Sequence, residues 1–154
     1  MVLTRLCGVA ALLLLAGLAW FLAPLEPGIV SLQLAYTPRV FGEIVHTWSP
    51  EDLARYRAHF PFDFALLLSY GCFGWRWVRQ SGLFATPGAA AWTLPLAAAC
   101  DAAENLFHLW LTEAPRFGVA WAYAASAGFA GAKWLLVLGF AGLVLAALWR
   151  ARKE

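Results

Sequence analysis

Four long apolar stretches separated by more polar segments set the pattern of the chain. They cover about residues 6–25, 60–78, 89–111 and 119–149. Each is long enough for an α-helix to cross the hydrocarbon core of a bilayer, which takes about 20 residues. The pattern therefore predicts an all-α fold, an integral membrane four-helix bundle that forms a single transmembrane domain over residues 1–154.

The segment between the first two stretches carries its own helical pattern. Thr37 followed by Pro38 is typical of an N-cap with proline at the first helical position, and Ser49 followed by Pro50 repeats the signal. Apolar residues recur after each start at helical spacing. We therefore expect two short amphipathic helices, at about residues 38–48 and 50–59, on the outer membrane surface.

Composition restricts the class of protein further. The hydrophobic set makes up 62% of the residues and only 13% are charged, against roughly 25% in an average soluble domain. So few charges exclude a soluble monomer and a protein that binds nucleic acid through a basic surface, and they indicate membrane lipids as the surroundings. The odd count of three cysteines argues against a disulfide-stapled secreted fold.

The basic residues indicate how the helices are oriented. With both termini in the cytoplasm, the inner side collects six of them and the outer side four. The inner group is Arg5, Arg76, Arg79, Arg150, Arg152 and Lys153, and the outer group is Arg39, Arg55, Arg57 and Arg116. This bias predicts a multi-pass protein of the bacterial inner membrane with both termini cytoplasmic. The first stretch resembles a signal peptide but has no persuasive cleavage site, so we expect it to stay as an anchor.

Several ionisable or strongly polar residues lie inside the predicted spans. They are Asp63, Asp101, Glu104, Asn105, His108 and Lys133. An ionised Asp or Lys at the centre of a spanning helix costs about 2.5–3.5 kcal/mol on insertion scales. These side chains are therefore expected to face the interior of the bundle.

Spacing brings four of these residues onto one helix face. Asp101, Glu104, Asn105 and His108 follow one another at i, i+3, i+4 and i+7. Lys133, near the middle of the fourth stretch, is the natural counter-ion of Asp101. The sequence thus predicts an acidic pocket that opens toward the outer surface. Its expected ligand-binding residues are Asp63, Tyr70, Asp101, Glu104, Asn105, His108 and Lys133.

The charges of this pocket do not cancel. Three carboxyl groups and one lysine leave two negative charges if all ionise, which a low dielectric does not tolerate. This excess negative charge can be removed in four ways. An acid can hold a proton, His108 can be charged, Arg57 and His59 can approach Asp63, or a cation can bind. An Asp101–Lys133 ion pair that only fixes helix register also fits the pattern.

Three functions remain open on these residues. The first is binding of a small hydrophobic, amphipathic or cationic ligand such as a lipid or an amine. The second is a lipid-modifying or isomerase-type enzyme with Glu104 and His108 as acid–base pair. The third is a non-catalytic subunit whose polar face pairs with another membrane protein or a second copy. Glu104 and His108 are spaced Glu-x-x-x-His, unlike the Glu-x-x-His of di-iron bundles, and no nucleotide motif occurs, so no metal or cofactor is predicted.

Three segments resemble a widespread group of small bacterial four-span membrane proteins without an assigned activity. They are Leu32-Gln33-Leu34-Ala35, Pro61-Phe62-Asp63-Phe64 and Asp101-Ala-Ala-Glu104-Asn105. The layout, with four spans, a long helical first loop and a basic C-terminus, is also similar to the EXPERA-type fold of the emopamil-binding protein and the sigma-2 receptor. That resemblance implies a buried acidic pocket for sterols or hydrophobic amines, and in its isomerase members a shift of a sterol double bond.

Overall fold

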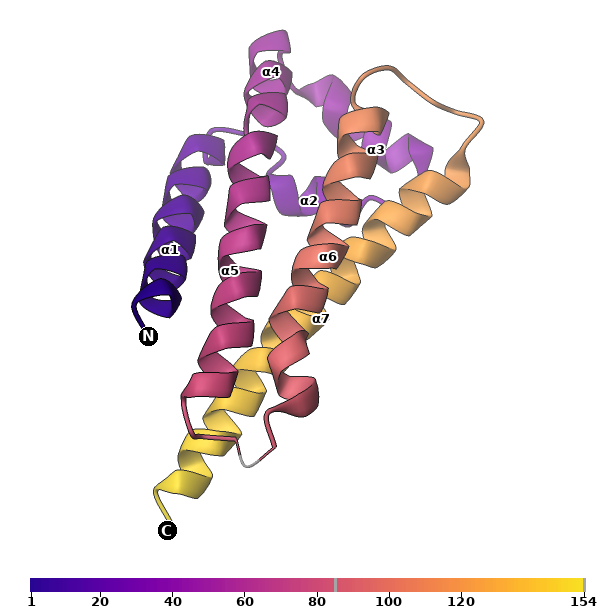
Figure 1. Ribbon diagram of the computed structural model, residues 1–154. Helices are drawn as coiled ribbons and strands as arrows, with labels where there is room; N and C mark the ends of the chain where they lie inside the picture. The colour runs from indigo at the N-terminus through magenta and orange to yellow at the C-terminus, as the bar shows by residue number, and fades with distance from the viewer. Residues whose placement is uncertain (85, 154) are drawn as a thin grey trace.

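The computed structural model describes residues 1–84 and 86–153, and within them the secondary structure is entirely helical (Figure 1). The helices are α1 (Val2–Leu22), α2 (Ile29–Gln33), α3 (Pro38–Thr47), α4 (Pro50–Ala58), α5 (Phe60–Gln80), α6 (Gly88–Leu111) and α7 (Ala120–Ala151). The predicted all-α class is therefore confirmed. The four long helices α1, α5, α6 and α7 coincide with the four apolar stretches, although α1 ends three residues before the expected boundary.

The two loop helices begin at the predicted caps. The Thr37 hydroxyl accepts a hydrogen bond from the Val40 amide, and the Ser49 hydroxyl accepts one from the Asp52 amide. Helix α2 was not predicted, because five residues are too few to show helical periodicity. Its formation depends on packing, since Leu32 is completely buried against the rest of the outer loop.

Two of the helices, α1 and α7, are long and apolar enough to cross a membrane by length and composition. Helices α5 and α6 are long enough but fall outside this class, because their charged and polar side chains lower their mean hydropathy. The structure therefore establishes an all-helical protein with two helices of spanning character. Crossing of the bilayer by α5 and α6 stays a prediction.

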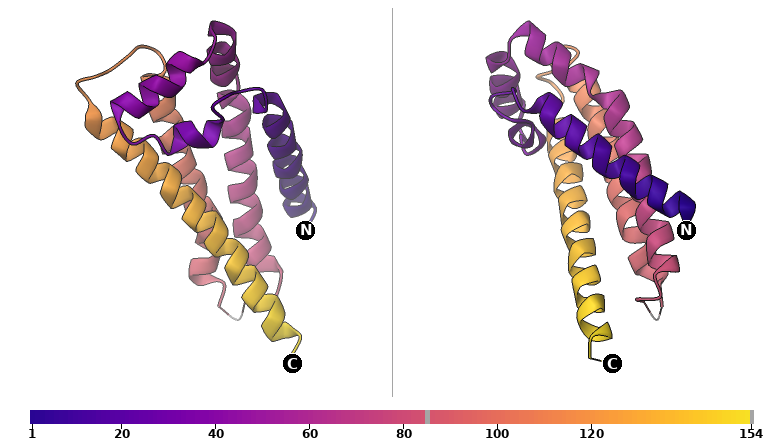
Figure 2. Two further views of the ribbon diagram at one scale, coloured as in Figure 1. Left: turned by 180° about the vertical axis from the view of Figure 1, so that it is seen from behind. Right: turned by 90° about the vertical axis from the view of Figure 1, so that its left-hand side faces the viewer.

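The long helices form a central pair with one neighbour on each side. Helix α5 packs along α6, α1 packs along α5, and α7 packs along α6 (Figures 1 and 2). Helices α2, α3 and α4 gather at one end of the bundle, and both chain termini point toward the other end. Helices α1 and α7 thus flank the α5–α6 pair without packing on each other.

Two glycines on α5 allow its close approach to α6. A Cβ added at Gly71 would lie 3.2 Å from the Ala98 Cβ, and one at Gly74 would lie 2.6 Å from the Leu94 side chain. Neither glycine has room for a side chain unless α6 shifts. This contact fixes the register of α5 against α6 next to Pro95, and with it the level of the polar residues one to two turns away.

The end of the bundle that carries α2–α4 is filled by a continuous apolar core. Phe41 of α3 packs edge-to-face on Tyr123 of α7 at a centroid distance of 5.2 Å, and Trp48 packs on Tyr56 at 5.0 Å. Leu25 and Leu32 complete this core from the first loop. The loop helices therefore form a packed cap over the long helices.

Candidate ligand-binding site

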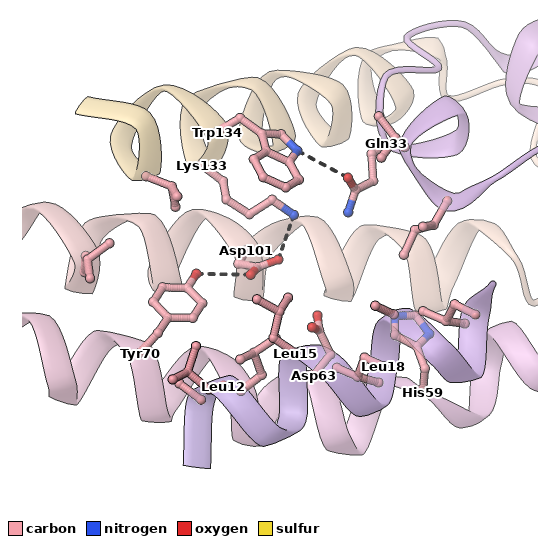
Figure 3. A pocket seen from close by; sticks show the side chains of 18 of the residues that line it. Leu12, Leu15, Leu18, Gln33, His59, Asp63, Tyr70, Asp101, Lys133 and Trp134 are labelled. Carbon is pink, nitrogen blue, oxygen red and sulfur yellow. Dashed lines mark hydrogen bonds and ion pairs between the residues drawn. The ribbon is translucent and has the colours of Figure 1, made fainter. Parts of the chain in front are cut away.

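A long groove of about 1230 Å³ runs between α1 and α7, with α5 and α6 as its floor (Figure 3). One wall is apolar and comes from α1, including Leu12, Leu15 and Leu18. The floor carries polar side chains near the middle of the groove, and α2 closes one end. This volume exceeds the roughly 300–1,000 Å³ of most small-molecule pockets, so a ligand of ordinary size fills only part of the groove.

Lys133 of α7 is the positive centre of the site. Its Nζ lies 3.0 Å from Asp101 Oδ1 and 2.7 Å from Glu104 Oε2, and all three side chains are buried. The expected Asp101–Lys133 contact is thus present, and Glu104 shares the same ammonium. Desolvation of the three charges is offset only because the ammonium contacts both carboxylates.

Tyr70 of α5 binds the second carboxylate oxygen of Asp101. Its hydroxyl donates a 3.0 Å hydrogen bond to Asp101 Oδ2, so both oxygens of this carboxylate have partners. Figure 3 shows Tyr70, Asp101 and Lys133 in one row across the floor of the groove. The row joins α5, α6 and α7 at one level.

Asp63 differs from Asp101 in lacking a cationic partner. Its Oδ2 accepts a 2.6 Å hydrogen bond from Asn105 Nδ2, and among the described residues no Lys, Arg or His nitrogen lies within 4.0 Å of it. The side chain is half-buried and lines the groove. Asp63 is therefore a carboxyl group supported by one neutral amide and turned toward the cavity.

His108 and Glu104 lie behind the groove. The Tyr56 hydroxyl and His108 Nδ1 are joined by a 2.6 Å hydrogen bond. Burial raises the pKa of Tyr56 well above its usual value, so the tyrosine stays protonated and donates to His108. Neither His108 Nε2 nor Glu104 Oε1 has a hydrogen-bond partner within the described part of the chain. Both side chains are closed off from the groove.

His59 lies at the junction of α4 and α5 and lines the groove above Asp63 (Figure 3). Its Nδ1 donates to the Tyr56 carbonyl oxygen. Burial lowers the pKa of this imidazole below its usual value, although the nearby Asp63 acts in the opposite direction. A neutral His59 adds no positive charge to the site.

Arg57 does not approach Asp63. Its Nη1 donates to the Leu109 carbonyl oxygen at 3.0 Å and to Thr112 Oγ1 at 2.8 Å, which fixes the end of α6. Of the ways to balance the pocket that the sequence left open, an arginine next to Asp63 is therefore wrong. The arginine instead satisfies backbone and hydroxyl acceptors at the helix end.

The expected site residues divide into two groups. Asp63, Tyr70, Asp101 and Lys133 line the groove. Glu104, Asn105 and His108 do not line it, but they support the lining residues or lie behind them. The groove runs lengthwise beside α1, and residues 28–31 and Gln33 line it at the end that carries the cap of α2–α4. Its opening toward the outer surface stays a prediction.

The lining residues that were not anticipated from the sequence include His59, Gln33 and Trp134. His59 was weighed only as a charge partner of Asp63, and Gln33 and Trp134 were not placed in the site. The Trp134 indole donates a 3.3 Å hydrogen bond to Gln33 Oε1, which joins α7 to α2. The signal for this contact was a tryptophan near the middle of the fourth apolar stretch, because tryptophans usually lie at the ends of spans as interfacial anchors.

Metal chemistry has no evident ligand set. Within residues 1–84 and 86–153, no group of three His, Cys, Asp or Glu side chains is arranged to hold a metal ion. Near the middle of the groove, the arrangement instead supplies an apolar wall, the carboxylate of Asp101 compensated by Lys133, and the carboxyl group of Asp63 without a cation. These features suit a ligand with an apolar body and a positive head.

No protein-family model, curated protein or solved structure matches the chain. Membership of the four-span group and of the EXPERA-type fold therefore stays a prediction from the sequence.

Proposed function

We propose that this protein is a four-span integral membrane protein that binds an amphipathic amine in the groove between α1 and α7. The single observation that carries the proposal is that the Asp63 carboxyl group lines an apolar groove and has no cation beside it.

The surface of the long helices supports a membrane location. Only 11% of the apolar window of α1 and 17% of that of α7 is buried in the protein, whereas a core helix of a soluble protein is mostly buried. Large apolar side chains are also exposed on α5 and α6, for example Leu68 and Leu106. Lipid contact accounts for this exposed apolar surface on all four helices.

The distribution of basic residues gives the proposed orientation. Both termini lie toward the end of the bundle opposite the cap (Figure 1). Under the positive-inside rule, that end is cytoplasmic and α2–α4 lie on the outer surface. The bacterial inner membrane fits this orientation.

The charges of the groove favour a cation over a neutral or anionic ligand. Asp101 and Glu104 share Lys133, and Asp63 has only the Asn105 amide. An ammonium next to Asp63 gains a charge-assisted hydrogen bond in a place of low dielectric. A carboxylate or phosphate head there meets repulsion from Asp63 and Asp101.

The apolar body of the ligand has a matching surface. Leu12, Leu15 and Leu18 of α1 face the polar floor across the groove (Figure 3). A chain or ring system that lies along these leucines buries apolar area at about 25 cal/mol per Å². The proposed ligand therefore combines a cationic head at Asp63 with an apolar body along α1.

The acid–base alternative draws less support from the geometry. Glu104 and His108 are 0% and 1% exposed, and neither lines the groove. A general acid or base must come within hydrogen-bond reach of the substrate. A ligand in the groove meets Asp63, Tyr70 and Asp101 first.

The test compares three probes with the same chain and different heads. Protein in lipid nanodiscs is titrated with dodecylamine, dodecanol and dodecanoate, and the thermal unfolding midpoint is recorded. We expect stabilisation by the amine only, and about a tenfold loss of its affinity in Asp63→Asn, which corresponds to about 1.4 kcal/mol. Asn keeps the acceptor for Asn105, so the variant is expected to fold.

Glu104→Gln is the matched control, because it removes a buried carboxylate that the groove does not expose. It is expected to bind dodecylamine as the wild type does. Equal responses to dodecylamine and dodecanol, or an unchanged response in Asp63→Asn, overturn the proposal. Absence of any response, together with a stable dimer in cross-linking, favours the subunit alternative.

A further inference from the structure

Two of the three cysteines meet where α1 crosses α5. Cys7 Sγ of α1 and Cys72 Sγ of α5 are 3.3 Å apart, although 65 residues separate them in the chain. Both are free thiols and both are partly exposed. Cys100 on α6 has no such neighbour among the described side chains.

The backbones are held close at this crossing. A Cβ added at Gly8, next to Cys7, would lie 3.0 Å from the ring of Phe73, next to Cys72. A disulfide needs the two sulfurs at about 2.05 Å, so they must approach by about 1.2 Å. Rotation of the two thiol side chains about their Cα–Cβ bonds moves the sulfurs in this direction.

A hydrogen bond between the two helices holds this crossing. Arg76 lies one helical turn beyond Cys72, and its Nε donates a 3.3 Å hydrogen bond to Thr4 Oγ1 of α1. The two thiols are therefore kept side by side by contacts on both sides of the pair.

Access to the pair is separate from the ligand groove. Cys72 lines a second, smaller hollow of about 530 Å³ between α5 and α6, together with Gly71 and Trp75. Neither Cys7 nor Cys72 lines the large groove. An oxidant can thus reach Cys72 whether or not the groove is occupied.

We propose that Cys7 and Cys72 form a reversible disulfide that ties α1 to α5. The oxidant is a hydroperoxide. One thiolate attacks the peroxide oxygen and expels the alcohol or water, and the second thiolate displaces hydroxide from the resulting sulfenic acid. Two thiols and ROOH give the disulfide, ROH and one water, and a dithiol reductant reverses the reaction.

The bond acts on one wall of the groove. Helix α1 packs chiefly on α5, and its other face supplies Leu12 and Leu15 to the groove. A covalent tie at Cys7 keeps this wall in place. This consequence rests on the proposed ligand function, whereas formation of the bond does not.

The experiment counts thiols in protein embedded in nanodiscs. Reduced protein is expected to react with iodoacetamide at all three cysteines. After a stoichiometric hydroperoxide treatment, only Cys100 is expected to react, the intact mass falls by two hydrogens, and dithiothreitol restores all three. Continued alkylation of Cys7 and Cys72, mass gain by added oxygen, or disulfide-linked dimers overturns the proposal.

Single variants show whether the tie is specific and what it does. Cys100→Ser is expected to keep the redox response, and Cys72→Ser to lose it and leave Cys7 alkylatable. Oxidation is expected to raise the unfolding midpoint of the wild type by about 5 °C or more, and not that of Cys72→Ser. An equal midpoint shift in Cys72→Ser overturns the tie. A failed amine titration overturns only the ligand function, because thiol pairing is measured without ligand.

Discussion

The polar residues of the site form two groups, one around Lys133 and one around Asp63, which differ in how their carboxyl groups are neutralised. We call them the Lys133 half and the Asp63 half. In the Lys133 half, Asp101 and Glu104 both contact one ammonium, and Tyr70 completes the shell of Asp101. In the Asp63 half, a single carboxyl group has one amide donor and lies beneath a neutral His59. Both halves reach the groove, but the side chains of Asp101, Glu104 and Lys133 are buried, whereas that of Asp63 is half-buried.

This contrast indicates that the Lys133 half stabilises the fold, whereas the Asp63 half is available to bind a ligand. Charges that are buried and matched hold helices in register, and their loss is felt in folding. A carboxyl group that is partly accessible and unmatched contributes little to folding and remains available for a partner from outside. We therefore expect the two halves to respond differently to the same kind of substitution.

The largest effect is expected at Lys133. Lys133→Met removes the ammonium and leaves Asp101 and Glu104 buried without a cation, which costs about 3–5 kcal/mol of stability. Thermal unfolding in nanodiscs measures the loss. Adding Asp101→Asn and Glu104→Gln to Lys133→Met removes the stranded charges and is expected to restore most of the stability. A loss below about 1 kcal/mol in the single variant would show that the ion pairs are not structural.

A smaller effect is expected from the pH response of His59. Because burial lowers its pKa, the folded protein keeps His59 neutral while the unfolded chain takes up a proton below about pH 6.5. Stability should fall as the pH drops from about 7 to about 5.5, by no more than about 1 kcal/mol from this residue. His59→Gln is expected to flatten this slope, in paired unfolding curves at each pH. A steeper fall in the variant would mean that Asp63 holds a proton on His59 and that the two halves are alike.

The smallest effect is expected at Glu104. Glu104→Gln leaves Asp101 and Lys133 as a one-to-one pair, and the new amide oxygen can still accept from Nζ. The change in unfolding free energy should stay within about 1 kcal/mol. A loss as large as that of Lys133→Met would place Glu104, and not Asp101, as the main partner of the lysine.

The long helices and their inward polar face were readable from the sequence for physical reasons. Apolar length predicts α1 and α7 directly, and the i, i+3, i+4, i+7 spacing of Asp101 to His108 predicts one helix face. The pairing of Asp101 with Lys133 follows from depth alone. The caps at Thr37 and Ser49 were equally local, because each involves only residues within one turn.

The direction of the groove could not be read in the same way. It depends on α1 packing against α5 and not against α7, a choice that the apolar pattern of α1 does not make. Likewise, Glu104 and Asp101 share a helix face, yet only Asp101 lines the cavity, because a rotation of a few tens of degrees about the α6 axis decides which of them does. Spacing along one helix does not contain that rotation.

The Gln33–Trp134 hydrogen bond links the loop between α1 and α5 to the helix that carries the buried ammonium. Gln33 belongs to the short helix that closes one end of the groove, and Trp134 is the residue after Lys133, whose ammonium lies 5.5 Å from the indole ring centroid. A displacement of α2 must therefore either break this hydrogen bond or move the Trp134 side chain. The position of the short loop helix and the setting of the interior charge are thereby connected through one indole.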